Sequence, residues 1–224
     1  MNNISNLDNL TRITRRREFE DGLMDFVYGG FFLILSLAGG LFFSTTGLRW
    51  LVTALLYSRE ITIVGLIGVV AFVILLISGG KRIVERIRRT MIWKERGFVK
   101  SLRWQVSWPI NLLASAFSIL MIIMAAWLMV RGLIALEIFL RAFIASMGIA
   151  TGIVYFGVGI ELGLPRYKWV GVVGALSSAL ILILPTSFSV SWLIFGLAWM
   201  VVLTISGLWA LRQSLQVLEE RNSD

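Results

Sequence analysis

The feature that most constrains this chain is a series of long apolar runs, each close to the length that a helix needs to cross a bilayer. Six such runs occur, at 23–43, 61–78, 110–130, 142–162, 167–184 and 191–211. A helix needs about 20 apolar residues to cross the hydrocarbon core, and a backbone in lipid must satisfy its own hydrogen bonds. The runs predict an all-α fold, a polytopic transmembrane bundle of six spans arranged as three hairpins.

The overall composition agrees with a membrane protein. Of 224 residues, 58% are hydrophobic and only 15% are charged, and the mean hydropathy is +0.85. A soluble domain of this length cannot bury that much apolar surface. The first 22 residues are polar and the first apolar run is about as long as a full span, so no signal peptide is expected. We expect a chain without a separate soluble domain.

The basic residues indicate how the spans are oriented. Of the 21 Lys and Arg residues, 17 fall in segments that six spans would place on one side, and the other side holds only Arg49, Arg59, Arg131 and Arg141. Cytoplasmic loops carry the excess of Lys and Arg, so both termini are predicted to be cytoplasmic. The expected division is a cytoplasmic segment 1–22, a transmembrane domain 23–211 and a cytoplasmic tail 212–224, in a prokaryotic cytoplasmic (inner) membrane.

The two connections on the opposite side are themselves apolar. In 48–57, four leucines and a valine share one helical face, which is typical of a helix lying at the membrane interface. In 131–141, Glu137 stands four residues before Arg141, a favourable order for an ion pair within a helix. Either connection is an interfacial helix or an extension of a neighbouring span, and the sequence leaves both readings open.

The largest predicted cytoplasmic element is 81–107, which carries a net charge of +7. Its apolar residues share a face, so span two is expected to continue as a basic amphipathic helix. We interpret Arg82, Arg86, Arg89 and Arg96 as an anchor on anionic lipid, since each basic residue near such a surface contributes about 1 kcal/mol. A protein partner or an anionic ligand is the alternative, and nucleic acid is not expected because no second recognition feature accompanies the charge.

Acidic residues gather at the start of the first span. Asp21 is placed to cap the helix, and Asp25 lies in the first turn, where the helix dipole favours negative charge. If helix persists upstream, Glu18, Asp21 and Asp25 share one face. We therefore hypothesise that this acidic face docks on the basic segment 81–103.

Binding residues within the spans are few. Glu161 lies about one turn from the cytoplasmic end of span four, where it either pairs with Arg166 or Lys168 or forms a cation or proton site. A polar stripe on span three is the other candidate, and it either lets helices pack or lines a permeation path; its members are Asn111, Ser115 and Ser118.

Small residues at helical spacing predict close helix packing. Gly148, Gly152, Gly171 and Ala175 occur in spans four and five, and Gly29 is followed by Gly30 in span one. Small side chains let transmembrane helix backbones approach closely. A tight bundle is therefore expected in preference to a wide aqueous pore.

Two residue types are missing from the sequence. There is no histidine and no cysteine, which removes the usual general base, the usual zinc ligands and any Ser-His or thiol nucleophile. We expect no catalytic site, no metal site and no cofactor.

The C-terminal part of the chain resembles a known family. "KWVGVVGALSSALILILPTSFSVSWLIFGLAWMVVLTISGLWAL" (168–211) has a tryptophan-led span, Gly171 and Ser178 seven residues apart, Pro185 at its outer end, and a returning span with Gly196 and Gly207. Together with the approach from about 148, it resembles the terminal hairpin of the HdeD-like acid-resistance membrane proteins. That resemblance implies a six-span bundle of three hairpins and a role in membrane stress, with no catalytic residues to transfer. The chain departs from the pattern at Ser178, where glycine is preferred, and in the basic segment 81–107.

Three classes of function remain. The first is a non-enzymatic membrane protein that associates with lipid or with other proteins, as a homo-oligomer or with a membrane-protein partner, including stress-related roles. The second is a channel, permease or permease subunit that uses Glu161 and the stripe on span three. The third is an enzyme acting at the cytoplasmic interface, against which the missing histidine argues.

Overall fold

The computed structural model describes residues 16, 19–88 and 107–223, and the regular structure in these residues is helical, without a strand. The helices are α2 (Leu23–Phe42), α3 (Thr45–Tyr57), α4 (Arg59–Ile87), α5 (Trp108–Val130), α6 (Leu136–Glu161), α7 (Pro165–Leu180) and α8 (Phe188–Ser223). The expectation of an all-α helix bundle is therefore confirmed for this part of the chain.

Four of the described helices are long and apolar enough to cross a membrane. They are α2, α5, α6 and the Phe188–Gln216 part of α8. The predicted runs 61–78 and 167–184 coincide with α4 and with α7 plus the turn that follows it. The lengths and compositions of the four helices identify a helical membrane protein.

The helix ends follow local sequence signals. The side chain of Ser44 accepts a hydrogen bond from Gly47 N at 3.0 Å and caps α3. Pro109 and Pro165 stand in the first turns of α5 and α7, where the missing N–H is not needed for the helix. Gly163 has a φ of +64° in the tight turn between α6 and α7, a backbone conformation that favours glycine.

The two apolar connections take different forms. Residues 48–57 belong to a separate helix, α3, which has no buried residue. Residues 131–135 form a turn, and 136–141 are the first residues of α6. The second connection thus extends the following helix, whereas the first is a short helix of its own.

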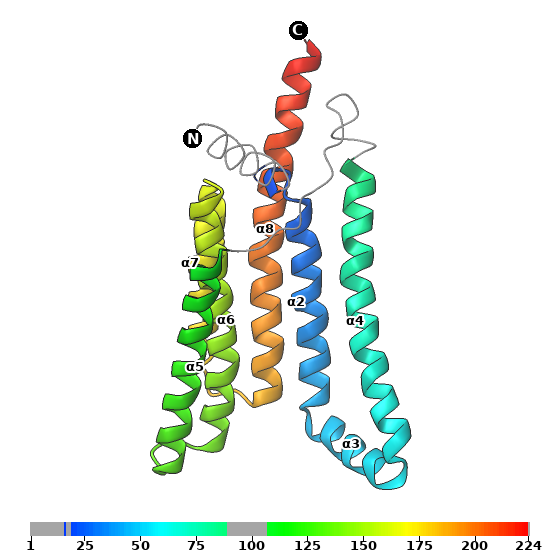
Figure 1. Cartoon of the computed structure of the whole chain (residues 1–224), viewed down its shortest axis with the longest axis vertical. Helices are drawn as coiled ribbons and strands as arrows, with labels where there is room; N and C mark the ends of the chain where they lie inside the picture. The colour runs from blue at the N-terminus through cyan, green and yellow to red at the C-terminus, as the bar shows by residue number, and fades with distance from the viewer. Residues whose placement is uncertain (1–15, 17–18, 89–106, 224) are drawn as a thin grey trace, which may run out of the picture.

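The helices run alongside one another for most of their length, with α3 crossing one end (Figure 1). Helix α8 lies in the middle and packs on α2, α7 and α6. Helix α5 packs on α6 at one edge of the bundle, and α4 contacts α2 and α3 at the other. Residues 212–223 continue α8, and the C-terminal end of this helix therefore extends past the other helices (Figure 1).

The core is centred on α8, where Phe195, Trp199 and Leu203 are almost completely buried. The Trp199 ring stacks on Phe32 of α2 with centroids 5.2 Å apart. The Trp199 indole N–H donates to the hydroxyl of Ser178 on α7 at 3.1 Å. A buried indole needs such a partner, so Ser178 has a definite role in the packing.

Small residues allow the helices to approach closely. A Cβ on Gly152 would lie 2.6 Å from the carbonyl oxygen of Gly171, and one on Gly148 would lie 2.0 Å from the Ser178 hydroxyl. The predicted close packing of α6 on α7 is confirmed at these positions. In contrast, no described residue of another helix lies within 4 Å of the Cβ position of Gly30, so no packing contact of the predicted kind is seen there.

Candidate functional site

Polar residues converge at the end of the bundle where α2 begins. Gly22 precedes α2 with a φ of +72°, and a Cβ there would lie 2.5 Å from the carbonyl oxygen of Gly207 in α8. The side chain of Asp21 accepts a hydrogen bond from Leu23 N at 3.1 Å. Glycine at 22 thus turns the chain into α2 and lets it lie directly against α8, so that Asp21 and Asp25 are both drawn into the protein.

Asp21 forms a two-point ion pair with Arg88 at the C-terminal end of α4. Arg88 Nε is 2.5 Å from one carboxylate oxygen of Asp21, and Nη2 is 2.8 Å from the other. Both side chains are buried, at 3% and 4% exposure. Bidentate Arg–carboxylate pairs are among the stronger charge-assisted hydrogen bonds, so this pair ties the end of α4 to the start of α2.

Asp25, one turn into α2, is completely buried and has three partners. The hydroxyl of Tyr167 donates to one carboxylate oxygen at 2.5 Å, and the hydroxyl of Ser206 donates to the other at 2.9 Å. Arg166 Nη1 lies 3.5 Å from the second oxygen. Helices α7 and α8 therefore supply the donors that a buried carboxylate requires.

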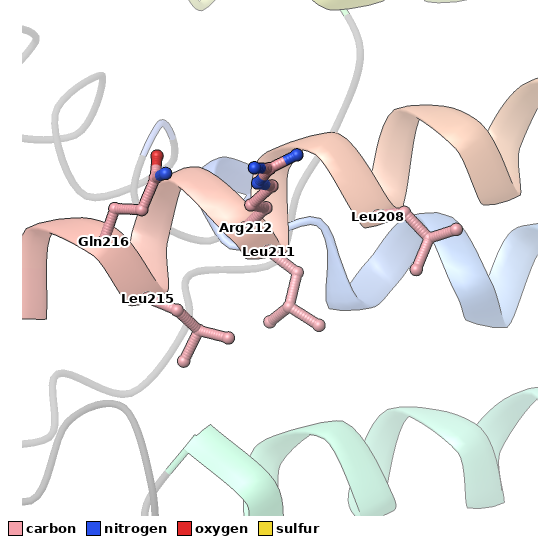
Figure 2. Close-up of a pocket in the computed structure, with 5 residues that line it drawn as sticks. All are labelled: Leu208, Leu211, Arg212, Leu215 and Gln216. Carbon is pink, nitrogen blue, oxygen red and sulfur yellow. The ribbon is translucent and has the colours of Figure 1, made fainter. Parts of the chain in front are cut away.

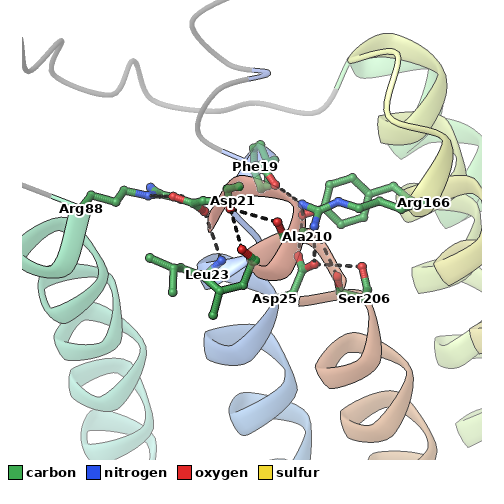
Figure 3. Close-up of polar contacts among 11 residues, drawn as sticks. Phe19, Asp21, Leu23, Asp25, Arg88, Arg166, Ser206 and Ala210 are labelled. Atoms are coloured by element: carbon green, nitrogen blue, oxygen red, sulfur yellow. Dashed lines mark hydrogen bonds and ion pairs between the residues drawn. The ribbon is translucent and has the colours of Figure 1, made fainter. Parts of the chain in front are cut away.

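Arg166 is the second buried cation of this cluster. It donates to the backbone carbonyl oxygens of Phe19 and Ser206, and its guanidinium lies over the ring of Tyr167, 4.8 Å from the centroid. Figure 3 shows Arg166 reaching from α7 toward Asp25 and Phe19, while Arg88 approaches Asp21 from the opposite side. One guanidinium thus neutralises Asp25 and satisfies two backbone acceptors.

We call Asp21, Asp25, Arg88, Arg166, Tyr167 and Ser206 the buried network. Its two acids and two arginines balance in charge, and it joins α2, α4, α7 and α8 at one end of the bundle. Removing one partner of a buried pair leaves an uncompensated charge, which is strongly destabilising. Because the carboxylate oxygens are engaged by protein donors, the arrangement suits a structural fastening of four helices. Among the described residues, no group of three or more acids is placed to hold a metal ion.

The candidate residues within the spans lie apart from this network. Glu161 is half-buried at the end of α6 and forms no ion pair with Arg166 or Lys168. On α5, Asn111 and Ser115 are exposed on the outer surface of the bundle. Ser118 donates to the carbonyl oxygen of Ser146 at 3.1 Å and so links α5 to α6.

The predicted docking residues are divided between the network and the surface. Asp21 and Asp25 lie in the network, whereas Arg82 and Arg86 are exposed on α4. Glu18, Arg89 and Arg96 lie outside the described residues, as does 89–106 of the basic segment.

Three members of the network, Arg166, Tyr167 and Ser206, are missing from the residues that the sequence singles out as sites. Arg88 was not named by itself, but it lies in the segment 81–103 on which the acidic face was expected to dock, and it pairs with Asp21. The two arginines enter the charge count that orients the spans, but their partners are far away in the chain. Arg88 is 67 residues from Asp21, and Ser206 is 181 residues from Asp25. The available signal was the pair of acids at the edge of a lipid-facing helix, where buried charge requires a partner.

The chain matches no family model, no curated protein and no solved structure. The likeness of its C-terminal hairpin to the HdeD-like proteins therefore stays a prediction from the sequence.

Proposed function

We propose that this chain is a six-span protein of a prokaryotic cytoplasmic membrane, with both termini in the cytoplasm, that associates with lipid or with other membrane proteins and performs no catalysis. Support for the six spans comes from α4 and α7, which coincide with the remaining two apolar runs. The asymmetry of the basic residues supports the orientation. In this topology the buried network lies at the cytoplasmic end of the bundle.

Labelling of single cysteines tests the topology. The chain has no cysteine, so each introduced thiol is unique. In intact cells we expect a membrane-impermeant maleimide to label Arg131→Cys, in the turn between α5 and α6, and not Arg212→Cys near the end of α8. Both must be labelled after the membrane is opened. Labelling of Arg212→Cys in intact cells would contradict the proposed orientation.

The observation that carries the proposed association is the outer face of α4. Ile67, Ile74 and Leu75 are each at least 60% exposed. On the other side of this helix, Gly80 faces Val27 of α2 and Val84 is buried. Among its described side chains, helix α4 therefore presents apolar residues away from the bundle at Ile67, Ile74 and Leu75. In a membrane such a face contacts lipid or another helix.

Cross-linking in native membranes tests this face. We expect a thiol-specific cross-linker to convert Ile67→Cys and Leu75→Cys into one discrete adduct, a dimer or a complex with one partner. Ile205→Cys on α8 is the matched control, because Ile205 is 63% exposed and apolar. Equal adduct formation at Ile205→Cys would indicate random collision and would count against α4 as an association face.

Flux measurements separate association from transport. In reconstituted liposomes we expect proton, potassium and glycerol flux at the level of empty liposomes, both for the wild-type chain and for Glu161→Gln. The exposed positions of Asn111 and Ser115 on α5 support this expectation. A flux that the wild type shows and Glu161→Gln lacks would overturn the association proposal in favour of a permease.

A further inference from the structure

A pocket of about 410 Å³ lies along the C-terminal part of α8, and the described residues that line it are Leu208, Leu211, Arg212, Leu215 and Gln216. Figure 2 shows the three leucines pointing to one side of α8 and Arg212 and Gln216 pointing to the other side in this view, and all five line the pocket. Small-molecule sites typically have volumes of about 300–1,000 Å³. The pocket is therefore large enough for a headgroup and the upper part of an acyl chain.

The pocket begins at the level of the network and extends outward from it. Gly207 and Ala210 of α8 contact Gly22 at the start of α2. Leu208 is thus level with the first residues of α2, and Arg212 and Gln216 lie one and two turns further along α8, at 1.5 Å per residue. Leu208 and Leu211 accordingly stand at the edge of the apolar zone, and Arg212, Leu215 and Gln216 stand where lipid headgroups begin.

The charges at this end favour an anionic occupant. Arg212 is exposed and forms no ion pair with any residue that the structure describes. Arg88 is already neutralised by Asp21 and Arg166 by Asp25, so among the described residues of the network and of the pocket lining, Arg212 is the guanidinium that remains to bind a ligand. A guanidinium binds phosphate oxygens in a bidentate manner, and the Gln216 amide can donate a further hydrogen bond.

We infer that the pocket on α8 binds one anionic phospholipid of the cytoplasmic leaflet, with its phosphate at Arg212 and Gln216 and the start of an acyl chain along Leu208 and Leu211. A free phosphate would use only the polar side chains, and a neutral lipid only the leucines. The combination fits a ligand that carries both groups. This inference rests on the proposed orientation in the membrane, but it is independent of the association face on α4.

The test places a fluorophore in the pocket. Leu208→Cys, labelled with a small bimane dye, is reconstituted as the full chain in vesicles of phosphatidylcholine with a small fraction of phosphatidylglycerol. One of the two lipids carries brominated acyl chains, which quench the dye on contact. We expect brominated phosphatidylglycerol to quench the bimane fluorescence much more strongly than its fraction of the total lipid would produce by random contact. Introducing Arg212→Gln is expected to lower this preference about fivefold, the effect of one basic residue near the surface.

The control changes an exposed arginine at the opposite end of the bundle. Arg131→Gln in the same labelled chain is expected to leave the preference unchanged. Equal quenching by the two lipids, or an equal loss in both variants, would overturn the inference. Displacement by inorganic phosphate at millimolar concentration would show a free-anion site and would also overturn it. A chain that retains the lipid preference but forms no adduct through α4 would refute the association face alone.

Discussion

Arg166→Met is expected to lower the free energy of unfolding by about 3–5 kcal/mol, the effect of breaking a buried ion pair from one side. Methionine keeps much of the length of the apolar stem of Arg166 and lacks the guanidinium that lies over the Tyr167 ring. It removes the charge facing Asp25 and the donor for the carbonyl oxygen of Phe19. The result is a completely buried carboxylate without a counter-charge. Unfolding of the purified chain in mixed micelles, titrated with denaturing detergent, measures the change.

Lys168→Met is the matched control for this measurement. Lys168 lies two residues further along α7 and is exposed, so its replacement should change stability by no more than about 0.5 kcal/mol. Adding Asp25→Asn to Arg166→Met should recover part of the loss, because the buried negative charge is then removed. A loss for Arg166→Met as small as that for Lys168→Met would show that the network does not fasten the helices.

The helices themselves were predictable because lipid imposes a length on every spanning segment. Each of the six apolar runs lies in a helix or in a helix and its following turn, and Pro109 and Pro165 mark two helix starts. The contact between Gly152 and Gly171 was also predictable from small residues at helical spacing. Gly30 carries the same sequence signal but faces open space, because spacing along a helix does not show which side of it a neighbour will cover.

The partners of the buried acids were not predictable in the same way. Local spacing suggests that Arg166 pairs with Glu161, since only a short turn separates them. In the structure the first turn of α7 instead buries Tyr167 against Asp25, and Arg166 is carried toward the start of α2 and α8. Which of the neighbouring basic residues near the end of α4 pairs with Asp21 likewise depends on the rotation of that helix about its axis. Such pairings are set by tertiary packing, which a single sequence does not encode in any local pattern.

Among the described residues, α4 packs on α2 and α3 and not on α5, α6, α7 or α8, so the pair of Arg88 and Asp21 should largely determine its position. Arg88→Glu places two carboxylates together in a buried site, and we expect the free energy of unfolding to fall by about 3–5 kcal/mol. The reversed pair, Asp21→Lys with Arg88→Glu, restores opposite charges and should recover most of that loss. Recovery will be incomplete by about 1 kcal/mol, because lysine cannot accept the hydrogen bond that Asp21 receives from Leu23 N.

The comparison of the single and double variants decides whether α4 is fastened by this ion pair. Arg82→Glu provides the control, since Arg82 is exposed on the same helix and its reversal should have little effect on stability. The same detergent titration measures global unfolding. Cross-linking between Gly80→Cys on α4 and Val27→Cys on α2, which face each other, reports separately whether α4 stays packed on α2. If the double variant is as unstable as the sum of its single changes, the two charges are not coupled. Helix α4 would then be held by its remaining contacts with α2 and α3.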